Sequence, residues 1–388
     1  MKRTTIFLFA LIVLCTAVSC GNVDDGLTAA RIDRIVNKLV PLESGEPVLD
    51  RSLEGRMEYY DVPGVSIAVI NNFEIEWAEG FGILDKESGA PVTGRTLFQA
   101  ASISKPVAAM AALKLAQDGR IGLSDNINNY LKTWKLPENE HTADRPVTLS
   151  HLLSHSGGTT VHGFRGYEPS EEIPTLRQVL NGESPANSDP VRVDMPPGTR
   201  YRYSGGGVTI MQVALMDITG RPFPGIAREY VLQPLGMLHS TYDQPLPSGL
   251  VQFAASGYRS NGREVEGKRH IYPEMAAAGL WTTPSDLAKF AIEVQLSIKG
   301  ESNRVLSREM AERMVTAFAD TVYGLGFSLT QKGYFGHSGS NEGFKCNLIA
   351  HLENGYGAVV MTNGDRGSLL IREILQAIAR EYEWENYQ

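Results

Sequence analysis

The chain has 388 residues, a hydrophobic content of 42% and a formal net charge of −8 at pH 7. This length and hydrophobic content predict a full-sized core in one large domain, or in one domain with a long insertion. The acidic balance and the absence of any basic run exclude nucleic acid as an expected partner.

The first residues predict an export signal. Lys2 and Arg3 precede an apolar run, Ile6–Val18, which is too short for a transmembrane helix but suits the hydrophobic part of a signal peptide. The run ends in small residues followed by Cys20, a pattern that resembles a bacterial lipobox with cleavage before Cys20 and lipid on its sulfur. The alternative is an ordinary signal peptide in which Cys20 is incidental.

These features predict the division of the chain and its location. We expect a lipoprotein signal peptide over residues 1–19, a tether over residues 20–30 and the folded domain over residues 31–388. A lipid anchor would hold the exported protein on a membrane surface of the bacterial cell envelope without spanning it, at the outer membrane or in the periplasm of a Gram-negative host. Cys346 then remains the single free cysteine, so we predict no disulfide within the domain.

Strand patterns gather at the two ends of the chain. Gly64–Ile70 and Glu74–Ala78 flank a turn at Asn71-Asn72 and predict a β-hairpin. Near the C-terminus, short apolar segments bounded by turn residues predict further strands over residues 326–330, 334–337, 345–350 and 357–361. A closing amphipathic helix follows them. The middle is rich in proline, glycine and short helical patterns, so the sequence predicts one sheet built from both ends with an all-α region, about residues 120–275, inserted.

Ser102 and Lys105 form the single Ser-x-x-Lys of the sequence and open an alanine-rich helical run. A step of three residues on a helix places both side chains on one face. A serine hydroxyl becomes an effective nucleophile when a neighbouring base takes its proton, and burial can lower the pKa of a lysine enough for that role. The alternative is that Ser102 caps a core helix and Lys105 reaches solvent.

Two later stretches also suit a reactive site. Tyr203 precedes a glycine run that begins at Gly205, and glycine lets the backbone approach a ligand closely. A phenol near a lysine ammonium is biased toward phenolate and can relay a proton, although Tyr203 could equally be a core or surface tyrosine. The second stretch contains His337, Ser338, Gly339 and Ser340, and on a strand edge it can present a backbone N–H to an oxyanion.

At these three stretches the sequence resembles the serine β-lactamase and penicillin-binding-protein superfamily, and within it the class C-like branch. That branch includes class C β-lactamases, family VIII carboxylesterases and D-amino-acid peptidases. The likeness extends over residues 60 to 365 and includes further segments at Val62–Ser66, Thr148–Gly158, Leu235–Met237 and Gly279–Leu287. The resemblance implies an α/β (α+β) fold of the β-lactamase/transpeptidase type, with an antiparallel sheet flanked by helices and an all-α region.

The resemblance also implies catalytic roles. Ser102 is then the nucleophile, Lys105 its partner and Tyr203 the proton shuttle, while His337 opens the third motif. The oxyanion hole would consist of the backbone N–H groups of Ser102 and Ser340. Because Lys105 and Tyr203 would share a proton, neither would titrate independently of the other.

Two departures from the β-lactamases bear on the substrate. Gly205 stands where those enzymes carry an asparagine that helps to hold the substrate's amide. His337 stands where they carry a lysine, so a fixed positive charge that would favour a substrate carboxylate is lost; Lys345 or Arg366 is the candidate replacement. Both departures favour esterase or peptidase members. The residues predicted to contact the substrate are Gly205, Ser338, Gly339, Trp281 and Lys345, although a core role suits Trp281 equally well.

The histidines in the helical middle raise the question of a metal site. His151 and His155 are four residues apart and could share a helix face as ligands. No glutamate follows His151, as it does in the His-Glu-x-x-His pattern of zinc proteases, and the resemblance makes this stretch structural. We therefore predict no metal site and no cofactor.

The expected function is a serine hydrolase that acts through an acyl-enzyme on a small ester, amide or peptide substrate. One alternative is a β-lactamase or D-Ala-D-Ala carboxypeptidase that acts on β-lactams or cell-wall peptides. Another is a surface-anchored binding protein that has lost catalysis. The intact Ser102, Lys105 and Tyr203 favour an enzyme, whereas Gly205 and His337 keep the binding protein as an alternative.

Overall fold

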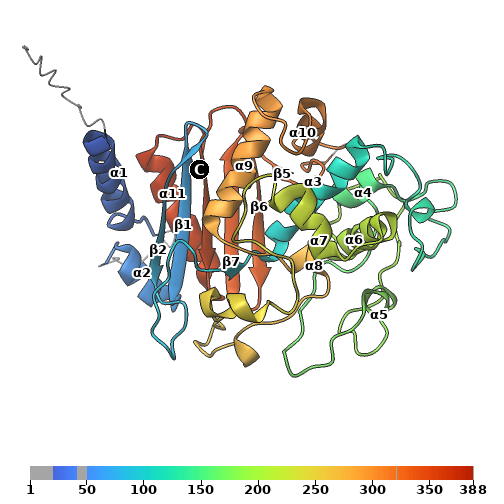
Figure 1. Cartoon of the computed structure of the whole chain (residues 1–388), viewed down its shortest axis with the longest axis horizontal. Helices are drawn as coiled ribbons and strands as arrows, with labels where there is room; N and C mark the ends of the chain where they lie inside the picture. The colour runs from blue at the N-terminus through green and yellow to red at the C-terminus, as the bar shows by residue number, and fades with distance from the viewer. Residues whose placement is uncertain (1–20, 42–49, 320, 388) are drawn as a thin grey trace, which may run out of the picture.

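The computed structural model describes residues 21–41, 50–319 and 321–387. Its centre is a six-stranded sheet in the order β2-β1-β8-β7-β6-β5, in which every neighbouring pair is antiparallel (Figure 1). The strands are β1 (Gly64–Asn71), β2 (Glu74–Gly82), β5 (Ser328–Leu329), β6 (Tyr334–Asn341), β7 (Phe344–His351) and β8 (Gly357–Thr362). The predicted hairpin and the sheet built from both ends of the chain are confirmed, because β1 pairs with β8.

Helices cover both faces of this sheet (Figure 1). On one face lie α1 (Gly21–Val36), α2 (Leu53–Tyr60) and α11 (Gly367–Glu381), and on the other lies α9 (Pro284–Lys299). Strand β1 is therefore buried on both of its faces. Val65 and Val69 pack in the core with α2 and α11, whereas Ala68 and Ile70 pack in the core on the opposite face. A strand buried on both sides reads as a continuous apolar run, as β1 does.

The helical region lies beside the end of the sheet that β6 and the short strand β5 form, and it begins with α3 (Ser104–Gln117) (Figure 1). Helix α3 is apolar nearly all round and is buried along its length, as such a helix must be. The other helices here are short, apart from the 15-residue α6: α4 (Leu149–Leu153), α5 (Leu176–Asn181), α6 (Gly205–Thr219), α7 (Phe223–Ala227), α8 (Met275–Ala278) and α10 (Arg308–Met314). A small two-stranded sheet, β3 (Phe98–Gln99) with β4 (Trp281–Thr282), joins this region to the rest.

The expected signal peptide, residues 1–19, and Cys20 lie outside the described residues. Residues 21–30 of the expected tether form the first part of α1. Arg31 pairs with Glu76 of β2 at 2.8 Å, and Arg34 pairs with Glu381 of α11 at 2.6 Å, so the second half of α1 is fixed to the domain. In the described part of the chain, no helix combines the length and apolarity needed to cross a membrane.

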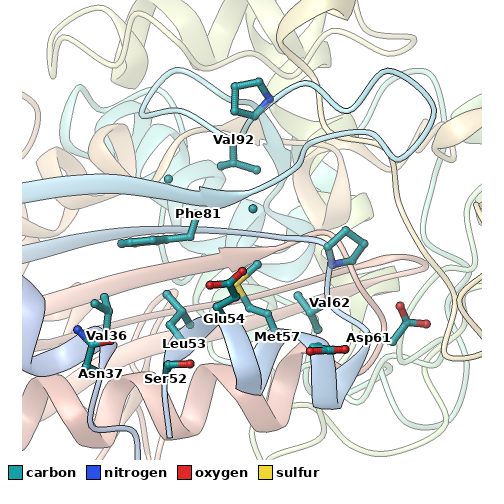
Figure 2. Close-up of a pocket in the computed structure, with 15 residues that line it drawn as sticks. Val36, Asn37, Ser52, Leu53, Glu54, Met57, Asp61, Val62, Phe81 and Val92 are labelled. Carbon is teal, nitrogen blue, oxygen red and sulfur yellow. The ribbon is translucent and has the colours of Figure 1, made fainter. Parts of the chain in front are cut away.

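A cavity of about 780 Å³ lies between α2 and the edge strand β2 (Figure 2). Leu53 and Met57 of α2 line one side, and Phe81 of β2 lines the other. None of the candidate site residues lines this cavity. Candidate residues such as Ser102 and Lys105 instead line a second cleft, between the sheet and the helical region.

Candidate active site

The candidate nucleophile lies on a strained turn. Ala101–Ile103 form one 3₁₀ turn that leads directly into α3. Ala101 has φ +48°, in the left-handed region that residues with a Cβ rarely adopt. Ala101 and Ile103 are buried, while Ser102 between them is half-buried. Strain of this kind persists where the surroundings enforce it, and here it presents one hydroxyl to a cleft.

Strand β6 packs directly beneath this turn. A Cβ on Gly339 would lie 2.3 Å from both the backbone oxygen of Ala100 and Sγ of Cys346, so only glycine allows this approach. The Cys346 thiol donates to the same Ala100 oxygen at 2.9 Å, and burial raises its pKa. Gly339 therefore supports the turn, and it is not among the residues that line the cleft.

Lys105 turns inward, which rules out the alternative in which it reaches solvent. Its side chain is 4% exposed, and Nζ donates to Ser102 Oγ at 3.0 Å and to the backbone oxygen of Ala277 at 2.7 Å. Burial lowers the pKa of Lys105 to about 7. A substantial fraction of this lysine is thus neutral near physiological pH, next to a hydroxyl whose proton it can accept.

Tyr203 lies on the other side of Ser102, immediately before α6. Burial raises the pKa of its phenol and outweighs the hydrogen bond with Ser102, which lowers it. The phenol is therefore neutral, contrary to the expected bias toward phenolate. Lys105 Nζ lies 5.0 Å from the centre of the Tyr203 ring, and the imidazole of His155 packs against that ring with centroids 4.3 Å apart.

His337 lines the cleft as a neutral imidazole. Burial, together with the nearby charge of Lys105, lowers its pKa to about 3. Its Nδ1 lies 2.6 Å from the backbone oxygen of Ser338. Because a carbonyl oxygen can only accept, Nδ1 carries the proton and Nε2 carries the lone pair. His337 thus supplies no positive charge to the site.

The outer edge of β6 faces the cleft. Strand β5 pairs with β6 only at Phe335 and Gly336, so the rest of that edge is not covered by another strand. The backbone oxygen of Tyr334 points to this side, since it accepts from Thr330 N–H at 2.8 Å. Backbone groups alternate along a strand, so the N–H of Ser340 points to the same side. The side chains of Ser338 and Ser340 also line the cleft.

Gly205 does not lie on a flexible turn. It is the first residue of α6, and a Cβ there would lie 3.1 Å from the Phe164 ring and 3.2 Å from the backbone oxygen of His162. The Phe164 ring thus fills the space beside Gly205, and it is Phe164 rather than Gly205 that lines the cleft. Gly205, predicted to contact the substrate, is therefore separated from the cleft by Phe164.

Two further predicted contacts lie away from the cleft. Trp281 is 1% exposed and packs edge-to-face on Phe344, with centroids 5.9 Å apart, so its core role holds. Lys345 forms an ion pair with Asp365 at 2.6 Å and donates to the backbone oxygen of Asn341. Arg366, the other candidate cation, lies over the Tyr60 ring. Neither cation replaces the positive charge that His337 lacks.

The cleft has a volume of about 630 Å³ and brings Ser102, Lys105, Tyr203 and His337 together. The sequence reasoning missed most of its wall, which consists of His162, Gly163, Phe164, Tyr201, Ala277, Ala278, Tyr323, Ser328 and Asn341. Val161, a β-branched residue at φ +63°, turns His162 into the cleft. This strained conformation is held by Gly206 N–H, which donates to the Val161 oxygen at 3.0 Å, and no sequence pattern indicates it.

The two histidines considered as metal ligands have structural contacts instead. His151 caps α4, because its Nδ1 accepts from Thr148 N–H at 3.3 Å. His155 is buried, and its Nδ1 accepts from Ser204 N–H at 3.2 Å, which supports the backbone beside Tyr203. Within the described ranges there is no group of three or more His, Cys, Asp or Glu side chains suited to hold a metal ion.

The chain is similar to several known proteins at low sequence identity. Protein flp of Staphylococcus aureus (strain N315) is 25% identical over 338 residues, which cover 81% of this chain but only 62% of that protein. The octameric penicillin-binding protein homologue from Pyrococcus abyssi superposes with a TM-score of 0.68 at 24% identity, over 85% of this chain and 77% of that one. D-alanine carboxypeptidase AmpC from Burkholderia cenocepacia gives a TM-score of 0.68 at 19% identity, over 91% and 99%.

At these identities, the solved structures establish the fold and the fold alone. A model of the beta-lactamase family, by contrast, matches residues 49–380, which is most of the chain. The matched segment includes Ser102, Lys105, Tyr203 and His337. The chain therefore belongs to the beta-lactamase family.

Proposed function

We propose that this protein is a serine hydrolase that transfers the acyl group of a small, uncharged ester or amide to Ser102 and then to water. The observation that carries the proposal is the position of Lys105. Its buried Nζ lies 3.0 Å from Ser102 Oγ, and its pKa is lowered to about 7, so a base stands next to the hydroxyl at working pH.

The proposed reaction uses four groups. Neutral Lys105 accepts the Ser102 proton as Oγ attacks the substrate carbonyl. The oxyanion that develops accepts hydrogen bonds from the backbone N–H groups of Ser102 and Ser340, and one such donor contributes about 3 kcal/mol. The carbonyl then re-forms, and the leaving group departs with a proton that Tyr203 passes on from Lys105. A water molecule attacks the acyl-enzyme by the same route and regenerates Ser102.

The charge of the cleft supports an uncharged substrate. His337 is neutral, Lys345 pairs with Asp365, and Nζ of Lys105 is already hydrogen-bonded to Ser102 and to the Ala277 oxygen. A substrate carboxylate would lose its water here without gaining a free cation, which is costly. This favours esters and small amides over β-lactams and acyl-D-Ala peptides, both of which carry a carboxylate.

The experiment that tests the proposal is intact-mass analysis after separate incubation with a fluorophosphonate and with a penicillin, alongside turnover of a p-nitrophenyl ester. We expect one fluorophosphonate adduct, mapped to Ser102 by peptide sequencing, with ester turnover and no lasting penicillin adduct. A lasting penicillin adduct would favour cell-wall peptide chemistry. If no reagent reacts, the chain is a binding protein on a hydrolase fold and the proposal is wrong.

We further propose that the protein is exported and anchored through lipid on Cys20, which lies outside the described residues. The sequence around Cys20 supports this proposal. In a bacterial expression host, we expect the full chain in the membrane fraction and the Cys20→Ser variant in the soluble fraction, because the anchor needs the thiol. Mass analysis of the N-terminal peptide checks the lipid directly, and an unmodified Cys20 would contradict the anchor.

A further inference from the structure

Two polar atoms in the wall of the cleft have no partner. The hydroxyl of Tyr323 and Nε2 of His337 are both buried, and neither hydrogen-bonds to any residue within the described ranges. Their side chains are 3% and 7% exposed, and both residues line the cleft together with Ser102. Buried polar groups are nearly always paired, and one that is left unpaired costs about 1–3 kcal/mol. Two such atoms in one cleft indicate that a molecule bound there supplies their hydrogen-bond partners.

The two atoms are complementary in kind. His337 Nε2 is an acceptor, because Nδ1 carries the proton and donates to the Ser338 oxygen. The Tyr323 hydroxyl can donate, since burial raises its pKa and keeps it protonated. The two rings meet edge-to-face with centroids 6.1 Å apart, so the donor and the acceptor belong to one small region of the wall.

The Tyr323 side chain is held in place by its surroundings. Its backbone N–H donates to Thr321 Oγ1 at 3.2 Å, and its ring packs on His155 with centroids 4.8 Å apart. The Tyr201 ring stacks on Tyr323 with centroids 5.7 Å apart and also contacts His155, and Tyr201 is 39% exposed. One of the side chains that cover Tyr323 is therefore at the surface, where a bound molecule can displace it.

We propose that Tyr323 is a substrate-binding residue whose hydroxyl donates to a neutral hydrogen-bonding group in the acyl part of the substrate, while His337 Nε2 accepts from the same group. A secondary amide satisfies both atoms through its C=O and N–H, and a hydroxyl satisfies both through one oxygen. A carboxylate does not, because it has no proton to give to Nε2. This assignment rests on the proposed function and narrows its substrates to N-acylamino or hydroxy acyl esters and amides.

A matched pair of substrates isolates this contact. The p-nitrophenyl esters of N-acetylglycine and of 4-methylpentanoic acid have the same heavy-atom skeleton, but only the first carries an amide. We expect the wild-type protein to prefer the amide-bearing ester in kcat/KM. In Tyr323→Phe, that preference should fall by about 10- to 100-fold, since a site built for a polar group discriminates strongly through it. The Ser102→Ala protein gives the background rate for both esters.

The melting temperature provides a second test. If Tyr323 had only a structural role, removing its hydroxyl would lower the Tm, whereas our proposal predicts a rise. Because Tyr323→Phe removes an unpaired buried hydroxyl, its Tm should rise by roughly 2 °C without substrate. The matched control is Tyr258→Phe, outside the cleft, whose hydroxyl accepts from Lys86 N–H at 2.6 Å. That variant should lose stability and keep the wild-type preference between the two esters.

The outcomes separate this inference from the proposed function. If the wild-type protein hydrolyses neither ester, the proposed function fails, and isothermal calorimetry of both esters on Ser102→Ala and Ser102→Ala/Tyr323→Phe still tests the contact. If the wild-type protein is active but Tyr323→Phe keeps the same preference, the Tyr323 assignment is overturned. A fall in Tm for Tyr323→Phe would likewise show that its hydroxyl already has a structural partner.

Discussion

Replacing Ser102 with alanine is expected to lower kcat/KM for a p-nitrophenyl ester by about 10⁴- to 10⁶-fold, to the rate that binding and the oxyanion donors alone can sustain. The physical reason is that, among the described residues, the hydroxyl hydrogen-bonded to Lys105 Nζ is that of Ser102, at 3.0 Å. Lys105 keeps its second acceptor, the Ala277 oxygen, so the fold should persist. Steady-state kinetics and circular dichroism on the same preparation measure both expectations.

Ser104 offers a matched control two residues away. Its hydroxyl accepts from Leu280 N–H at 2.9 Å and is fully buried, so it serves the fold and not the cleft. Ser104→Ala should lose about 1–3 kcal/mol of stability, because it leaves a buried N–H unpaired, and should still react with the fluorophosphonate. A Ser102→Ala protein with activity within tenfold of wild type would refute the nucleophile assignment.

Replacing Lys105 with methionine is expected to lower kcat/KM by about 10²- to 10⁴-fold, the usual contribution of a general base. The same change should stabilise the folded protein. Burial lowers the pKa of Lys105 to about 7 from an ordinary value of 10.5, so at neutral pH the unfolded chain holds more protons than the folded one. That difference costs the wild-type fold on the order of 3–5 kcal/mol at pH 7, and methionine removes it.

The pH profile of the wild-type protein follows from the same shift. The neutral amine is the active form, so kcat/KM should rise as pH passes about 7 and then level off, and Lys105→Met should lack this rise. The fold itself also depends on pH, because burial raises the pKa of Glu274 to about 8. This carboxyl favours the fold when protonated, so stability falls as pH rises from about 4.5 toward 8. Circular dichroism at each pH is therefore the control that the protein is still folded. A flat activity profile from pH 5 to 9 would contradict Lys105 as the base.

The sequence predicted those parts of the molecule that depend on local pattern or on a reactive motif. The hairpin at residues 64–82 was predictable because β-branched residues and a two-residue turn specify it locally. The proximity of Ser102 to Lys105 was predictable because helical spacing fixes it whatever the rest of the chain does. The union of both chain ends in one sheet was predictable from where the strand patterns lie.

Ser338 lines the cleft, whereas four other residues predicted to contact the substrate do not: Gly205, Gly339, Trp281 and Lys345. Which residues line a cleft depends on the direction that each one faces in the packed molecule. Gly339 and Gly205 are glycines because neighbouring atoms fill the space that a side chain would need, and not because a ligand does. Lys345 is engaged by Asp365, twenty residues further along the chain. Tyr323 belongs to the cleft wall through tertiary contacts with three other aromatic rings, and no local periodicity shows this.

The pairing of β1 with β8 also sets the order in which the molecule can come together. The turn that carries Ser102 rests on β6, and the sheet that contains β6 reaches β1 only through β7 and β8, nearly three hundred residues later in the chain. Such distant pairings close slowly, because a long loop must be ordered before any contact rewards it. A chain interrupted before its last strands would thus contain Ser102 and Lys105 but not the sheet against which the Ser102 turn packs. For this topology, the surroundings of Ser102 are complete only after strands β6, β7 and β8 have joined the sheet.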